Sequence, residues 1–169
     1  MAFTRKRLVV ASAAYAALAV MILLSVFIRS PRLVLTDFRT GEILWLASVR
    51  EGTWILITYT HSVNLTPVTE IFYVRGEEII LHAVEFSSFG AGMPAYPEDG
   101  QTMLTLPDGT VRIEGLDRVM NFMVSMVALA TGHTIAVGSR EIQLGNIAPP
   151  GTPVRFEIIR MNFWQSLLL

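Results

Sequence analysis

An uninterrupted run of 21 uncharged residues, from Leu8 to Ile28, is the feature that most constrains how this 169-residue chain can fold. As a helix rising about 1.5 Å per residue, such a run spans the roughly 30 Å hydrocarbon layer of a bilayer. Backbone polar groups in lipid must be bonded internally, and a helix achieves this. The run therefore predicts a single transmembrane anchor over residues 8–28.

Charges on either side of the run indicate its orientation. Arg5, Lys6 and Arg7 precede it without a neighbouring acid, which favours a cytoplasmic N-terminus, residues 1–7, and transfer of the remaining chain across the membrane. Arg29 and Arg32 follow the run and weaken this bias. A cleaved secretory signal is the alternative, with small residues in ASAAYAALA as its cleavage region. The length of the run and its FIRSP ending favour an uncleaved anchor.

The remaining chain is acidic and contains no cysteine. From Leu33 onward it has eight arginines, no lysine and all 14 acids, which gives a net charge of −6 (8 − 14). This balance argues against nucleic acid as a partner. The absence of cysteine excludes disulfides, cysteine metal sites, thiol nucleophiles and a lipoprotein anchor.

After Pro31, short apolar runs alternate with turn signals such as RTGE, REG, RGE, PDG and GSR. This pattern is typical of an antiparallel β-sandwich. We expect a linker over 29–32, a mainly β domain over 33–160 and an apolar tail over 161–169. The predicted strands are 33–38, 43–49, 53–60, 69–75, 78–86, 110–114, 134–137, 141–144 and 154–159.

Two apolar segments have open alternatives. The segment 119–130 is read as a strand that forms a hairpin with 134–137, with a helix in the membrane interface as the alternative. The tail carries the apolar residues Phe163 and Trp164. We expect them to be buried against the domain's own core, the bilayer interface or another protein.

The sequence RGEE predicts a two-residue hairpin loop of type II′ at Gly76-Glu77. This loop pairs Arg75 with Glu78, and counting outward places Glu70 opposite Ala83 with Glu85 diagonal to it. Side-chain alternation then puts Glu70 and Glu85 on one face. The same alternation in the preceding strand directs Tyr59 and His61 to one side, so that His61 is expected to approach both carboxylates.

The grouping of His61, Glu70 and Glu85 has three interpretations. In the first, they brace the glycine-containing loop FSSFGAGMPAYPEDG by accepting hydrogen bonds from its amides. In the second, they recognise a ligand, a metal ion or a partner. In the third, His61 is a catalytic base beside the hydroxyls of Ser62 or Thr66. No diagnostic catalytic or metal spacing accompanies them, so we favour bracing and expect no enzymatic activity, catalytic residue, metal or cofactor.

The segments HSVNLTPVTE and FSSFGAGMP together resemble a small bacterial family of unknown function, whose genes commonly lie beside those of TAXI-type tripartite ATP-independent periplasmic (TRAP) transporters. The resemblance covers most of residues 33–159. The matching positions are His61, Ser62, Val63, Pro67, Val68, Glu70, Gly90, Gly92 and Pro94.

This resemblance implies an accessory subunit of such a transporter, anchored in the bacterial inner membrane with its β domain in the periplasm. The expected partners are the lipid bilayer and the transporter's membrane subunit, with the periplasmic solute-binding protein as a further candidate. Ala13 and Ala17 are small residues at a spacing that allows close helix packing in lipid. With Phe163 and Trp164 they form the expected membrane-docking set. The alternative is a free-standing, membrane-anchored module that binds a small ligand or metal around His61, Glu70 and Glu85.

Overall fold

The computed structural model describes residues 2–90 and 92–167, and it describes the side chains of the N-terminal helix from Tyr15 onward. The chain divides into two compact units. One is a β domain, Pro31–Ile159; the other combines Met1–Ser30 with Arg160–Leu169. Each unit is described by itself.

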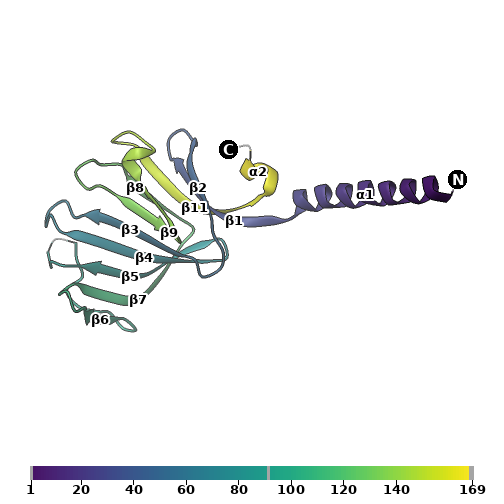
Figure 1. Ribbon diagram of the computed structural model, residues 1–169. Helices are drawn as coiled ribbons and strands as arrows, with labels where there is room; N and C mark the ends of the chain where they lie inside the picture. Colours follow the sequence, from purple (N-terminus) through teal and green to yellow (C-terminus); the bar gives the residue numbers. More distant parts are fainter. Residues whose placement is uncertain (1, 91, 168–169) are drawn as a thin grey trace. The chain divides into compact units, whose positions relative to one another are not determined.

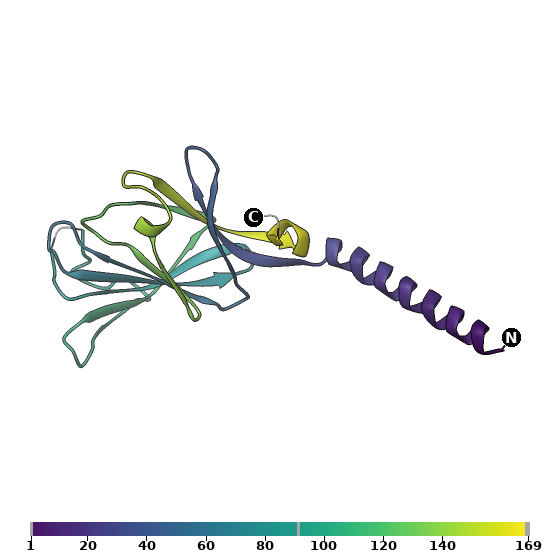
Figure 2. The same cartoon turned by 45° about the horizontal axis from the view of Figure 1, so that its top comes forward.

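The chain is mainly β and forms two antiparallel sheets, as the strand and turn pattern predicts (Figures 1 and 2). The smaller sheet has four strands in the order β2-β1-β11-β8. Their bounds are β1 Arg29–Asp37, β2 Ile43–Ser48, β8 Phe122–Met126 and β11 Pro153–Asn162. Residues 29–32, expected to form a linker, belong to β1.

The larger sheet has seven strands in the order β10-β9-β3-β4-β5-β7-β6. Their bounds are β3 Trp54–Thr60, β4 Pro67–Arg75, β5 Glu78–Phe86, β6 Thr102–Thr105, β7 Val111–Met120, β9 Thr134–Val137 and β10 Arg140–Gln143. A short 3-10 helix, Leu144–Asn146, follows β10.

Only part of the inner face of the larger sheet is covered by the smaller sheet. In that part, Leu33 and Leu35 of β1 and Phe156 of β11 share one core with Ile57 of β3 and Phe72 of β4. Burial of such large apolar side chains supplies most of the driving force for sheet packing.

A second apolar cluster lies on the β4, β5 and β7 strands of the larger sheet. Val68, Val84, Phe86 and Ile113 form its buried centre, and Met93, from the connection between β5 and β6, packs on it. Tyr59 contacts both clusters. The inner face is thus covered by the other sheet on one side and by the β5–β6 connection on the other.

The hairpin β4–β5 follows the predicted pairing near its turn and departs from it further away. Arg75 pairs with Glu78 and Phe72 with Leu81, as predicted. Gly76 has a φ of 61°. Between Leu81 and Ala83 the register shifts, because His82 is an extra residue in a β-bulge. Side chains along a strand alternate between its two faces. One extra residue therefore moves each following side chain of β5 to the face opposite to the predicted one.

The prediction that Glu70 lies opposite Ala83 is therefore wrong. Glu70 pairs with Val84, and Glu85 pairs with Thr69. Glu70 is on the inner face of the sheet and Glu85 is on the outer face. The shared carboxylate face predicted from the sequence does not exist, because the predicted register contained no bulge.

The segment 119–130 is partly extended, but the hairpin predicted for it is wrong. Its first residues complete β7, Asn121 forms a bend, and β8 follows. Strand β8 pairs with β11 in the smaller sheet, whereas β9 pairs with β3 in the larger sheet. The turn at 127–133 therefore carries the chain from one sheet to the other.

The second unit contains helix α1, Ala2–Phe27, and the short helix α2, Phe163–Leu167. Within the described residues, the structure has no helix that is long and apolar enough to cross a membrane. The predicted transmembrane anchor has no support from this observation and stays a prediction. Residues 163–167 form a helix without buried residues rather than a last strand in the core.

Candidate functional site

The inner face of the larger sheet carries a pocket of about 510 Å³ where the two apolar clusters meet. Strands β3, β4, β5 and β7 and the β5–β6 connection contribute to its wall. Its lining residues are Tyr59, Glu70, Leu81, Val84, Gly92, Met93, Pro94, Tyr96, Glu98, Gln101, Leu116 and Arg118. Only Glu70, Gly92 and Pro94 of this set were singled out from the sequence.

Glu70 is the acidic group on the inner face of the sheet, directly opposite Ile57 of β3. Burial raises the pKa of its carboxyl group above the usual value, and a hydrogen bond from the Tyr59 hydroxyl partly opposes this shift. None of the ion pairs among the described residues includes Glu70. The pocket therefore contains a carboxyl group that forms no ion pair within the described chain, although Arg118 lines the same pocket.

Tyr59 connects this carboxyl group with a histidine. Burial, the charge of Glu70 and the hydrogen bond to Glu70 together raise the pKa of Tyr59 to about 12. The ring of Tyr59 stacks on the imidazole of His133, with centroids 4.9 Å apart and an interplanar angle of 22°. Tyr59 is thus coupled to Glu70 through its hydroxyl, and its ring packs against the imidazole of His133.

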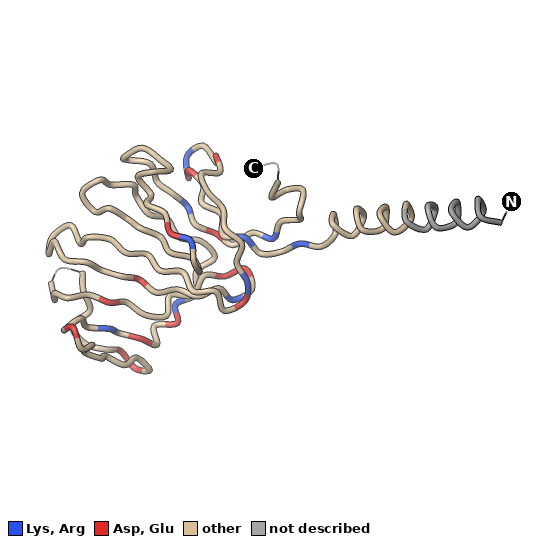
Figure 3. Tube along the Cα trace, in the orientation of Figure 1, with Lys and Arg blue, Asp and Glu red and all other residues tan. Residues whose placement is uncertain are grey.

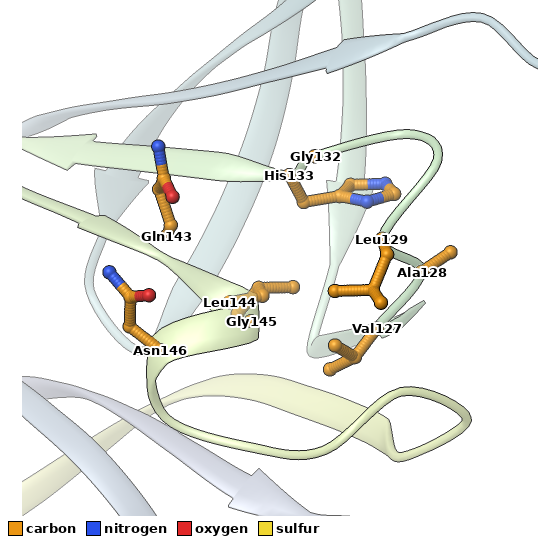
Figure 4. A pocket seen from close by; sticks show the side chains of 9 residues that line it. All are labelled: Val127, Ala128, Leu129, Gly132, His133, Gln143, Leu144, Gly145 and Asn146. Atoms are coloured by element: carbon orange, nitrogen blue, oxygen red, sulfur yellow. The ribbon is translucent and has the colours of Figure 1, made fainter.

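His133 lines a second, smaller pocket of about 150 Å³ (Figure 4). Figure 4 shows its imidazole above Leu129, with Leu144 directed toward the same space. The ring contacts the Thr131 hydroxyl through Nδ1, 3.1 Å away. Burial lowers the pKa of His133, which favours a neutral ring next to Tyr59.

A second irregularity positions the β7 side of the larger pocket. Opposite His82, strand β7 contains the extra residues 115–117, and both Gly115 (φ 79°) and Asp117 (φ 40°) have positive φ. The Asp117 carboxylate lies 3.1 Å from Nδ1 of His82. This double bulge brings Leu116 and Arg118 to the pocket wall. Bulges next to functional sites commonly direct side chains in this way.

Gly115 is also required by a close backbone contact. A Cβ atom at this position would lie 2.8 Å from the carbonyl oxygen of Gly100. The turn that approaches β7 here is closed by hydrogen bonds between Glu98 and Gln101, including a 3.0 Å bond from the Glu98 amide to the Gln101 side chain. The rim residues Glu98 and Gln101 are thereby held against the bulge.

His61 lies outside this pocket and caps a turn. Its Nδ1 accepts hydrogen bonds from the amides of Val63 and Asn64, each 3.2 Å long. The turn is closed by bonds from Leu65 N to His61 O and from His61 N to Thr66 O. Ser62 is exposed in the same turn, and Pro67 is the exposed first residue of β4, opposite Thr60. The expected approach of His61 to Glu70 and Glu85 does not occur, because β3 ends at Thr60.

The turn docks on the β5–β6 connection through Asn64. The Asn64 amide donates a 3.4 Å hydrogen bond to the Ser88 carbonyl. A Cβ atom on Gly90 would lie 2.5 Å from Oδ1 of Asn64, so the side chain fits only against a glycine. Further along, Gly92 has a φ of 81°, which favours glycine, and Pro94 lines the pocket.

Glu85 forms a separate pair on the outer face of the sheet. Its carboxylate accepts two hydrogen bonds from the guanidinium of Arg112, which lies directly opposite on β7. Across the described chain, no group of three or more metal-ligating side chains is close enough to hold an ion. The structure therefore does not bring His61, Glu70 and Glu85 together.

The residues expected to dock on a membrane or a partner lie in the helical unit. Ala17 is exposed on α1, whereas the side chain of Ala13 is outside the described residues. Phe163 and Trp164 are 56% and 41% exposed on α2, and the Trp164 indole donates a 2.8 Å hydrogen bond to the Ser25 hydroxyl of α1. Asn162 also donates a hydrogen bond to the Val26 carbonyl.

Nine of the twelve lining residues were not predicted from the sequence, Tyr59 and Arg118 among them. Alternation along β3 already placed Tyr59 on one side of its strand. Its hydroxyl could therefore have been considered as a partner for Glu70, beside the histidine. Arg118 carried no such signal, because the sequence EGLDR reads as a turn rather than as a bulged strand.

Fold and site together define a two-sheet β domain with a pocket on the inner face of its larger sheet. The chain belongs to the family described as domain of unknown function DUF1850, whose model matches residues 55–144, just over half of the chain. No curated protein and no solved structure matches it. The matched range contains all the strands of the larger sheet apart from the first residue of β3, and all residues that line the larger pocket.

Proposed function

We propose that this protein is an accessory subunit of a TAXI-type TRAP transporter, held in the bacterial inner membrane by residues 8–28 with its β domain in the periplasm. Its partners are the lipid bilayer and the large membrane subunit, and the solute-binding protein is a further candidate. The resemblance of HSVNLTPVTE and FSSFGAGMP to a family encoded beside such transporters suggests the partner. The family match itself carries no transporter context.

The observation that carries this proposal is the exposed apolar surface of the helical unit. From Tyr15 onward, large apolar side chains are exposed all around α1, among them Tyr15 (74%) and Phe27 (75%), and Ile28 directly after the helix is 66% exposed. Phe163 and Leu167 of α2 are exposed as well. An apolar surface of this kind needs lipid or another protein to cover it.

The contacts between α1 and α2 favour lipid as part of that cover. Trp164 bonds to Ser25, near the C-terminal end of α1, so α2 lies beside the end of the predicted membrane segment. Tryptophan is enriched where apolar and aqueous layers meet, because its indole is apolar on its faces and polar at its N–H group. In the proposed arrangement, α2 rests at the periplasmic surface of the bilayer.

The β domain is suited to an aqueous compartment. Acidic residues are distributed along its strands and turns (Figure 3). The net charge of −6 from residue 33 onward (eight arginines and 14 acids) keeps this part away from anionic lipid and nucleic acid.

Co-purification tests the proposal. The tagged full-length chain is expressed with a TAXI-type TRAP membrane subunit, extracted in mild detergent and purified through its tag. We expect the membrane subunit to elute with it. If the two chains never elute together and do not crosslink in membranes, the proposal is wrong.

A matched pair of variants tests whether α1 forms the contact. Ala17→Leu adds bulk to the predicted packing face, whereas Ala19→Leu adds the same bulk about 200° around the helix. We expect Ala17→Leu to reduce the co-purified membrane subunit and Ala19→Leu to leave it unchanged. An equal effect of both variants would argue against a specific helix contact.

A further inference from the structure

The larger pocket of the β domain has the properties of a binding site that neither the family match nor the transporter proposal assigns. Its volume of about 510 Å³ is within the range of pockets for small organic molecules. Part of its wall is apolar, through Leu81, Val84 and Leu116, and polar side chains line the rest, among them Tyr59, Glu70 and Arg118. A site with this composition holds the apolar part of a ligand by burial and orients it through a few polar contacts.

The charges in the pocket define the ligand's polar group. On the rim, the exposed Arg118 and Glu98 carry opposite charges. Inside, Glu70 forms no ion pair among the described residues, and the Tyr59 hydroxyl interacts with it. A carboxylate has several acceptor positions, so one hydroxyl leaves most of them open. An ionised carboxylate of this kind is costly to bury without a cation.

Three features show that the chain maintains this arrangement. Tyr59 interacts with Glu70 through its hydroxyl, and its ring stacks on the imidazole of His133. The strained bulge at Gly115 and Asp117 places Leu116 at the wall and Arg118 at the rim. A core that needed only apolar packing would have an aliphatic residue at position 70, as at Ile57 directly opposite.

We propose that this pocket binds a small amphipathic amine, whose ammonium group pairs with Glu70 and whose apolar part lies against Leu81, Val84 and Leu116. The ammonium group supplies the positive charge and the hydrogen-bond donors that Glu70 lacks. Arg118 at the rim sets a limit on ligand length and favours amines that end in a neutral or anionic group. This inference is independent of the transporter proposal.

A set of three matched probes tests the ligand class. The full-length chain in detergent micelles is titrated at pH 7.5 with 3-phenylpropylamine, 3-phenylpropanol or 3-phenylpropanoate, and titrations into empty micelles are subtracted. Binding is followed by calorimetry and by NMR signals of the tyrosine rings. We expect saturable binding of the amine, and binding of the alcohol and the carboxylate at least about tenfold weaker, because a charge-assisted hydrogen bond contributes roughly that factor.

Variants and pH assign the amine to Glu70. Glu70→Gln keeps the size of the side chain and the acceptor for Tyr59 but removes the charge, so amine affinity should fall about tenfold or more. Glu141→Gln removes one exposed acid of β10 and should leave affinity unchanged. Lowering the pH to about 4.5 should weaken amine binding to the unchanged chain, because Glu70 is then mostly protonated.

The proposal is overturned by any of three results. These are the absence of saturable amine binding, equal or tighter binding of 3-phenylpropanoate, and unchanged amine affinity in Glu70→Gln. Thermal unfolding and circular dichroism of each variant verify that the β domain is folded. Tyr59→Phe provides a second variant, which should weaken amine binding by a smaller factor because it leaves the charge of Glu70 in place.

Discussion

Glu70 combines a partly buried position with an acidic side chain, and this combination makes stability depend on pH. Its pKa in the folded chain lies above the value of about 4.5 in the unfolded chain. Between these two values the folded state binds more protons, so the free energy of unfolding falls as pH rises through this window. The glutamine in Glu70→Gln does not titrate, so the free energy of unfolding of this variant does not fall for this reason.

We therefore expect Glu70→Gln to gain stability relative to the unchanged chain as pH rises from about 4 to about 7. Urea unfolding in a series of buffers measures the difference at each pH. Glu141→Gln, at an exposed position, is the control and should show a constant difference. A constant difference for Glu70→Gln would mean that the carboxyl group is not shifted by burial.

The titration of the Tyr59 hydroxyl can be tested at alkaline pH. The chain has four tyrosines, and Tyr59 titrates at about 12 because burial and Glu70 both disfavour its phenolate. In ultraviolet titration, Tyr59→Phe should remove the transition with the highest pKa, and Tyr96→Phe, at an 83% exposed position, should retain it. Glu70→Gln should lower that pKa without restoring the usual 10, because burial remains. An unchanged highest transition in Tyr59→Phe would contradict this assignment.

At the scale of elements, the β7 bulge is a conformation that only particular residues permit. Gly115 has positive φ and also faces the Gly100 carbonyl, whereas Gly109 has positive φ in open space. Alanine at either position incurs the cost of a left-handed conformation, about 1 kcal/mol. At Gly115 the close backbone contact adds to it.

We therefore expect Gly115→Ala to destabilise the domain by about 1 kcal/mol or more beyond Gly109→Ala, as measured by chemical denaturation. NMR should also show changes for Leu116 and Arg118 in Gly115→Ala only. Equal costs for the two substitutions would show that the contact with Gly100 relaxes freely.

The junction between the His61 turn and the β5–β6 connection is a second element whose parts depend on each other. Gly90→Ala forces Asn64 away from the Ser88 carbonyl, and Asn64→Ala removes the same hydrogen bond and creates space for a Cβ atom. Each substitution should cost about 1 kcal/mol, and the double variant should cost clearly less than their sum. A double-mutant cycle of urea unfolding measures this coupling. Strict additivity would mean that Asn64 and Gly90 do not share a contact.

Sequence reasoning succeeded where a local signal fixes the structure. Strand β5 and the turn at Gly76 were predicted correctly, since alternation and turn chemistry act over a few residues. The bulge at His82 was not predictable in this way. Its cause is a contact between strands distant in sequence, where Asp117 binds His82 and Gly100 approaches Gly115. This error placed Glu85 on the wrong face of the sheet. The expectation that His61 lies beside Glu70 had a separate cause, because strand alternation was continued past Thr60, where β3 ends.

At the scale of the whole molecule, the family match separates most of one sheet from most of the other, while the main core joins residues of both sheets. The match covers nearly all of the larger sheet, the site and β8, whereas β1, β2, β11 and both helices lie outside it. The matched range thus contains nearly all of the larger sheet and the residues that line its pocket. Strands β1, β2 and β11 pack with β8 over one side of this sheet, and in our proposal the N-terminal helix attaches the chain to a membrane.

The absence of cysteine from the chain allows a direct test of that attachment. A single cysteine in place of Asp99, in an exposed turn of the β domain, probes the proposed periplasmic side. A single cysteine in place of Thr4 probes the proposed cytoplasmic side. If residues 8–28 cross the inner membrane with the N-terminus inside, a charged maleimide that cannot cross lipid should label Asp99→Cys in intact spheroplasts. It should label Thr4→Cys only after the cells are lysed, because arginine and lysine residues before the run keep that end in the cytoplasm. The unsubstituted chain provides a background without any reactive thiol. Labelling of both variants before lysis, or of neither, would exclude the proposed topology, and loss of the Thr4→Cys signal from mature protein would show that the segment is cleaved.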